Sequence, residues 1–146
     1  MSRYTNTFYT NLTFEEFNTI VSQYLTAQGF KQINPNYDQL WKKGVGLLTA
    51  PMYIGALYNP QQFSVTICAY IKFALLPGVY IGEMDLTGFF GAVPKSMLKT
   101  KVAELEQMLN QTAYNKQIFM QQQQQQQNFQ QPVQQGFQQN YNNYNN

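Results

Sequence analysis

The sequence contains no histidine and a single cysteine, Cys68. Histidine is the commonest general base and metal ligand, so its absence excludes every histidine-containing catalytic triad. A single cysteine can form neither an intramolecular disulfide nor a thiolate metal cage. Because the remaining residues form no recognisable catalytic constellation, we expect a non-enzymatic protein that uses no cofactor and no metal.

Secretory and membrane-spanning signals are also missing. The first residues, Met-Ser-Arg-Tyr-Thr-Asn-Thr-Phe, contain no apolar stretch typical of a signal peptide. The longest apolar window, residues 65–81, includes Lys72 and the Pro77-Gly78 pair, and it falls short of the roughly 18–20 uncharged apolar residues that span a bilayer. We therefore expect a soluble cytoplasmic protein.

Charge disappears at residue 117. Residues 1–116 carry all nine Lys and Arg and all seven Asp and Glu, whereas 20 of the 30 residues from Gln117 to Asn146 are Gln or Asn. This change predicts a compact domain over 1–116, followed by a disordered low-complexity tail over 117–146. Because glutamine is a fair helix former, the last helix can extend into the tail before it frays near Pro132.

An N-terminal helix is predicted over residues 13–28. Thr13 and Glu16 have the spacing of a capping box, and Gly29 suits the left-handed position after a helix. Apolar residues recur at helical spacing between these signals: Phe14, Phe17, Val21 and Leu25.

Four or five strands are predicted next. Short strands are expected over 30–34 and 38–43, and the run 47–58 contains Pro51, which favours an edge strand or a bulge. The residues at every odd position from Phe63 to Leu75 are apolar, which predicts a long strand with one buried face. A further strand is expected over 79–86.

A second helix is predicted with Pro94 near its first turn, and with a buried stripe formed by Leu98, Val102, Leu105 and Leu109. The order of elements predicts an α+β fold in two layers: an N-terminal helix, a sheet of four or five mainly antiparallel strands, a C-terminal helix and the tail.

The candidate contact site is the loop Gly88–Lys95. It contains Phe89 and Phe90 between glycines, and Lys95, Lys99 and Lys101 follow at the start of the second helix. Aromatic rings beside lysines are typical of peripheral membrane contacts with anionic lipids. The simpler interpretation, which we favour, is that both rings pack against the end of the sheet.

Three smaller patterns are also considered. Cys68 has no histidine to activate it and is interpreted as structural. Glu83 and Asp85 share one face of a strand, but a cation site needs more ligands. Trp41 with Lys42 and Lys43 resembles a stacking surface for single-stranded nucleic acid, yet a net charge of +2 is too small to favour that partner.

The leading hypothesis is a protein-interaction or self-association module, because catalytic groups are lacking and Gln/Asn-rich tails add weak multivalent contacts. One alternative is a lipid-binding or peripheral membrane domain that uses the loop 88–95 and the following lysines. The other is a domain that binds a small apolar ligand between its sheet and helices.

Overall fold

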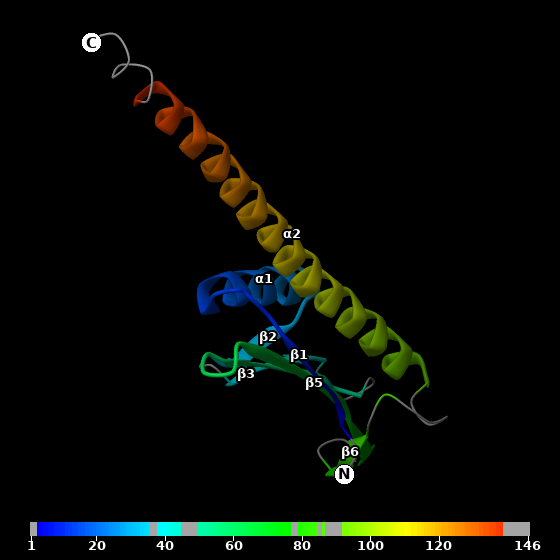
Figure 1. The fold of residues 1–146 in the computed structure, drawn as a ribbon. Coiled ribbons are helices and arrows are strands. Elements are labelled where there is room, and N and C mark those ends of the chain that lie inside the picture. Colours follow the sequence, from blue (N-terminus) through cyan, green and yellow to red (C-terminus); the bar gives the residue numbers. More distant parts are fainter. Residues whose placement is uncertain are drawn as a thin grey trace, which may run out of the picture.

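The computed structural model describes residues 3–35, 38–44, 50–76, 79–84, 86 and 92–138. Both helices lie on one face of a six-stranded sheet, as Figure 1 shows, so the predicted two-layer α+β fold is confirmed. The elements in chain order are β1 (Tyr4–Tyr9), α1 (Phe14–Ala27), β2 (Lys31–Asn34), β3 (Asp38–Lys43), β4 (Met52–Asn59), β5 (Ser64–Leu76), β6 (Val79–Met84) and α2 (Ala92–Gln138).

The sheet is antiparallel, with the strand order β1-β5-β4-β3-β2. The long strand β5 pairs with β1 along its first half and with β6 along its second half. Ile71 is opposite Met52 of β4 and Met84 of β6, so β6 and β1 occupy the same side of β5. β5 therefore organises the sheet.

Local signals place α1 as predicted. Thr13 is the N-cap, and its hydroxyl accepts a hydrogen bond from the Glu16 N–H (3.2 Å), while Glu16 accepts from the Thr13 N–H (2.7 Å). Gly29 has a φ of +82°, and the N–H of Phe30 returns to the carbonyl of Leu25. The predicted capping box and the glycine stop are both confirmed.

The expectation for Pro51 was wrong. β4 lies between β3 and β5 and is not an edge strand, and its pairing with both neighbours has no bulge. Pro51 precedes the first paired residue, Met52, and offers only its carbonyl, which accepts the N–H of Lys72 (3.1 Å). Because Pro51 lies outside the paired residues, its missing backbone N–H removes no hydrogen bond from the sheet.

β1 was not predicted. Its sequence, Tyr-Thr-Asn-Thr-Phe-Tyr, alternates half-buried and exposed positions, which is the period of a strand. The even residues are polar or aromatic rather than aliphatic, so the signal is weak. β1 raises the strand number above the predicted four or five.

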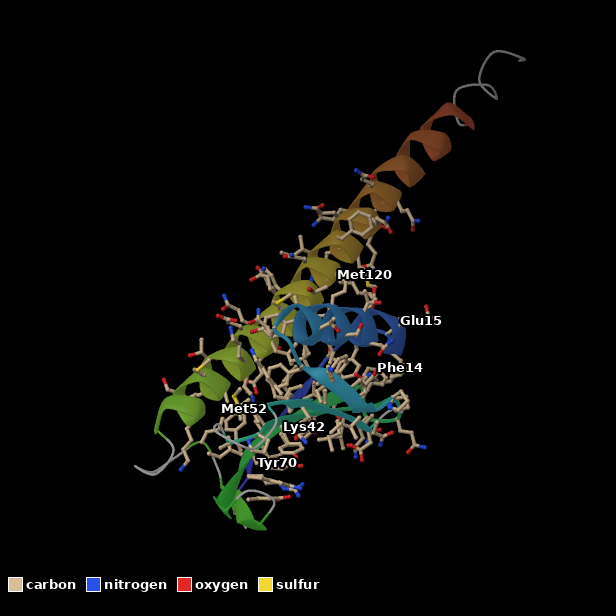
Figure 2. The ribbon with its side chains drawn as sticks, turned by 180° about the vertical axis from the view of Figure 1, so that it is seen from behind. Phe14, Glu15, Lys42, Met52, Tyr70 and Met120 are labelled. Carbon is tan, nitrogen blue, oxygen red and sulfur yellow. The ribbon has the colours of Figure 1, made fainter. Side chains whose placement is uncertain are left out.

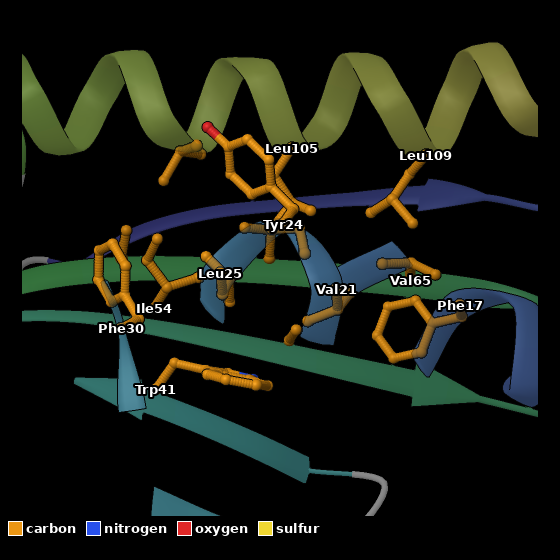
Figure 3. Close-up of a cluster of buried hydrophobic side chains, with 14 of the residues drawn as sticks. Phe17, Val21, Tyr24, Leu25, Phe30, Trp41, Ile54, Val65, Leu105 and Leu109 are labelled. Atoms are coloured by element: carbon orange, nitrogen blue, oxygen red, sulfur yellow. The ribbon is translucent and has the colours of Figure 1, made fainter. Parts of the chain in front are cut away.

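The core lies between the sheet and the helices (Figure 3). α1 contributes Phe17, Val21 and Leu25, and the odd residues of β5 from Val65 to Ile71 face them. The stripe predicted on α2 is confirmed, since Leu98, Val102, Leu105 and Leu109 are all buried.

Polar contacts hold α2 along both flanks. Tyr24 of α1 donates its hydroxyl hydrogen to Glu104, and Tyr4 of β1 donates to Glu106 (3.1 Å). Burial is the main reason that the pKa of each tyrosine is raised. The hydroxyl forms that donate these bonds are therefore favoured.

Among the described residues, the ion pair nearest the C-terminal end of α2 joins Lys116 to Glu16 (2.8 Å). From Phe119 to Asn128 every residue of α2 is exposed, and the helix projects beyond the domain in Figure 1. The backbone stays helical through Gln138, so α2 does not end near Pro132 as expected.

Candidate functional site

The face of the sheet opposite the helices carries a continuous row of large side chains. Strand register aligns Lys31 with Lys42, Lys42 with Tyr53, and Tyr53 with Tyr70. Arg3, immediately before β1, completes the row because its guanidinium lies over the ring of Tyr70. The row crosses five strands, which is about 19 Å at the usual strand spacing. We name these five residues the cation–tyrosine row.

Two stacked rings occupy the centre of the row. The rings of Tyr53 and Tyr70 are 4.9 Å apart and tilted by only 5°. Arg3 caps Tyr70 at 4.4 Å, and the ammonium groups of Lys72 and Lys42 lie 5.0 and 5.8 Å from the centroid of Tyr53. The rings are only 7% and 5% exposed, although neither described helix covers this face. Figure 2 shows Tyr70 on the side of the sheet away from α1 and α2.

Positive charge outweighs negative charge around this row. Four cations (Arg3, Lys31, Lys42 and Lys72) share the face with the described acids Glu83 and Asp38. Glu83 is bound to Arg3 at 2.6 Å, and this bond is the first cause of the raised pKa of Arg3. Lys31 and Lys42 are direct cross-strand neighbours, an arrangement of like charges that destabilises a sheet.

The same face is hollowed further along the strands. A depression of about 520 Å³ is lined by Thr7, Asp38, Leu57 and Thr66, among others. It begins four residues along β4 from Tyr53, which is about 13 Å at strand rise. Between the row and this depression lies Gly55, which has no side chain and is buried opposite Cys68.

A second hollow, of about 540 Å³, lies where β1, the β4–β5 turn and α2 meet. Three exposed aromatic residues line it: Tyr9, Phe63 and Tyr114, with exposed fractions of 86%, 63% and 58%. Its polar lining includes Asn11, Asn110 and Gln117. We name it the aromatic hollow.

The backbone at Phe63 is unusual. Its φ is +48°, the only positive φ of a non-glycine residue in the described part of the chain. Side chains other than glycine rarely adopt this left-handed region, which costs roughly 1–2 kcal/mol. The carbonyl of Phe63 accepts the N–H of Thr10 (2.8 Å), which joins the turn to the end of β1.

The predicted loop site is only partly within the described residues. Phe89 and Phe90 lie outside them, so their exposure stays untested. Lys95 is buried, Lys99 is exposed and Lys101 is half-buried, all three on α2. The membrane and apolar-ligand hypotheses therefore remain predictions.

The other predicted residues are Cys68, Glu83, Asp85 and Trp41. Cys68 is half-buried opposite Gly55, and burial raises the pKa of its thiol, which disfavours the nucleophilic thiolate. Glu83 pairs with Arg3, and Asp85 lies outside the described residues. Trp41 is buried in the core, where its N–H donates to Gln39 (3.2 Å), so it is not available for stacking with a base.

Sequence reasoning found neither surface site, because each joins residues far apart in the chain.

Comparisons with protein-family models, with curated proteins and with solved structures found no match to this chain. Within the described ranges, no cluster of three or more potential metal ligands occurs, and no helix is long and apolar enough to cross a membrane. Function has to be inferred from the surfaces.

Proposed function

We propose that the domain is a non-enzymatic protein-interaction module whose contact site is the aromatic hollow. One observation carries the proposal: Tyr9, Phe63 and Tyr114 expose most of their surface and surround a single depression. Exposed apolar surface gathered at one place marks an interaction site far more often than single exposed residues do.

The composition of the hollow suits a protein partner. Tyrosine and phenylalanine are enriched at the centres of interfaces, where they bury large areas with few rotatable bonds. The asparagine and glutamine side chains around them offer hydrogen bonds to a partner backbone. An apolar side chain of the partner placed among the three rings would bury apolar surface against them.

Backbone strain at Phe63 supports the same conclusion. Positive φ in a bulky residue costs stability, and such costs persist at sites where they serve a function. The strained turn holds an aromatic ring outward, where it contributes little to the fold. A glycine would satisfy the backbone better, but it would remove the ring.

Site-specific photocrosslinking in the full chain tests the proposal. Benzoylphenylalanine replaces Phe63 in one variant and Lys99, an exposed residue of α2 that does not line the hollow, in another. We expect a discrete crosslinked species from position 63 in the cells that produce the protein, and none from position 99. The mass of that species distinguishes a second copy from another protein.

A pair of variants provides the control. Phe63→Gly combined with Tyr114→Gln removes two rings of the hollow, whereas Phe119→Gln removes a similarly exposed ring elsewhere on α2. For this comparison benzoylphenylalanine replaces Tyr9, the third aromatic residue of the hollow. Its crosslinking should disappear in the first variant and persist in the second. Equal crosslinking in both variants, or none from the native hollow, would refute the proposal.

A further inference from the structure

The face with the cation–tyrosine row points to a second binding site, independent of the aromatic hollow. We propose that this face binds an acidic, partly apolar peptide segment of a partner protein. The juxtaposition that carries the inference is a set of three cations against two stacked tyrosine rings, with Lys31 next in the row and a depression lined by Leu57 about 13 Å along the strands.

Charge complementarity identifies the partner as an anion. Lys42 and Lys72 both approach the ring of Tyr53, and no ion pair to either lysine occurs among the described residues. Lys31 extends the same charge to the edge of the sheet. Carboxylates placed between these ammonium groups would relieve their mutual repulsion.

The ring geometry decides against nucleic acid. A base binds such a surface by stacking on a free aromatic face. Here Tyr53 and Tyr70 cover each other, while Arg3 and the lysines cover their outer faces. Four cations without a stacking surface would give only the weak phosphate contacts of non-specific binding.

The apolar part of the face favours a peptide. Leu40 and Leu57 are half-buried on this side of the sheet, and Leu57 lines the depression about 13 Å from the row. An extended peptide spans that distance with about four residues. Its carboxylates would meet the lysines while an apolar side chain enters the depression.

Fluorescence anisotropy with the full chain tests the site. The probe is a labelled synthetic peptide of glutamates with two interspersed leucines, and the control peptide carries glutamine in place of each glutamate. We expect the acidic peptide to bind and the glutamine peptide to fail. Binding should weaken as salt is raised, because exposed charges are screened within about 10 Å at 0.1 M salt.

Charge variants locate the binding. Lys42→Gln with Lys72→Gln should weaken binding about tenfold, the change expected when two charge contacts are lost. The matched control, Lys99→Gln with Lys101→Gln, removes the same charge from α2 and should change affinity less than about twofold. Because Lys42 and Lys72 also cover Tyr53, Lys31→Gln is the second test. It touches no ring in the structure and should weaken binding about threefold.

Three results would overturn the proposal. One is failure of the acidic peptide to bind. Another is an equal loss of affinity in the α2 control. The third is equal or tighter binding of oligothymidylate, or of vesicles containing phosphatidylserine, with the same sensitivity to Lys31→Gln, which would assign the face to nucleic acid or membrane. Because none of these variants touches the aromatic hollow, failure here leaves the proposed function standing.

Discussion

A β-carbon added to Gly55 would lie 2.4 Å from the sulfur of Cys68, its direct cross-strand partner. Contacts this short do not occur between real side chains, so the two positions are sterically coupled. The next two nearest atoms are backbone oxygens at 3.8 and 3.9 Å, which are ordinary contacts. Of these three nearest atoms, only the sulfur is too close for a larger residue.

Gly55→Ala should therefore reduce the free energy of unfolding by about 1–3 kcal/mol, the usual cost of overpacking. In a Cys68→Ala background the same substitution should be neutral or stabilising, because alanine restricts the unfolded chain more than glycine does. Urea denaturation of the two single variants and the double variant measures this coupling. Additive losses would show that the sulfur is not the cause.

Phe63→Gly should increase stability. Glycine adopts a φ of +48° without strain, and the ring that it removes is largely exposed. We expect a gain of about 1 kcal/mol in the free energy of unfolding, with Phe119→Gly as a comparison that destabilises its helix. A loss of stability on Phe63→Gly would mean that the ring packs in the fold and is not held outward for binding.

Elements with strong local signals were predictable from the sequence. The capping box at Thr13 and Glu16 fixed the start of α1, and the seven apolar odd positions fixed β5. β1 was missed because it exists through pairing with β5, some sixty residues later, rather than through its own hydrophobicity. The predicted run 47–58 included Pro51, which is why an edge strand or a bulge was expected. β4 begins one residue later, at Met52, so the proline lies outside the paired residues.

The surface sites could not be predicted for a similar reason. Arg3, Lys42, Tyr53 and Tyr70 become neighbours only when four strands adopt one register. Period-two alternation placed Tyr70 on the less buried face of β5, but a single strand does not specify what lies beside it. The aromatic hollow likewise joins three distant segments of the chain.

Glu16 should stabilise the domain above pH 5 and contribute less in acid. A hydrogen bond from Lys116 is the first cause of its lowered pKa, followed by the backbone N–H of Thr13. Because the pKa is lower in the folded state, the contribution is present above the ordinary carboxyl value of about 4.3 and is lost as pH falls through the folded value. The side chain is 42% exposed, so we expect only about 0.5 kcal/mol.

Urea denaturation of Glu16→Gln at several pH values measures this contribution. The difference from the native chain should be present at pH 7 and vanish near pH 3. Glu15→Gln, in the same helical turn but outside the ion pair, is the control. A difference that persists unchanged in acid would exclude an electrostatic origin.

The hydrogen bond between Tyr24 of α1 and Glu104 of α2 should be lost at alkaline pH, when the tyrosine hydroxyl ionises. Burial and the hydrogen bond to Glu104 raise its pKa above the ordinary value of about 10. Its contribution is therefore complete below pH 10 and is lost as pH rises through the folded value. Tyr24→Phe should cost about 1 kcal/mol at pH 7 and remove one late-titrating tyrosine from the ultraviolet titration. Tyr114→Phe, an exposed comparison, should leave the free energy of unfolding unchanged.

The projecting part of α2 should exchange its amide hydrogens quickly. Residues 98–109 bury a leucine-rich stripe in the core, whereas residues 119–128 are exposed on every side and are mostly glutamine. A helix without tertiary packing relies on local propensity alone, which is marginal in water. Hydrogen exchange on the full chain should show core amides of α2 protected by several orders of magnitude and those beyond Met120 within about tenfold of unstructured peptide. Strong protection beyond Met120 would require another surface to cover the projecting helix, and dilution of the sample would show whether a second copy supplies it.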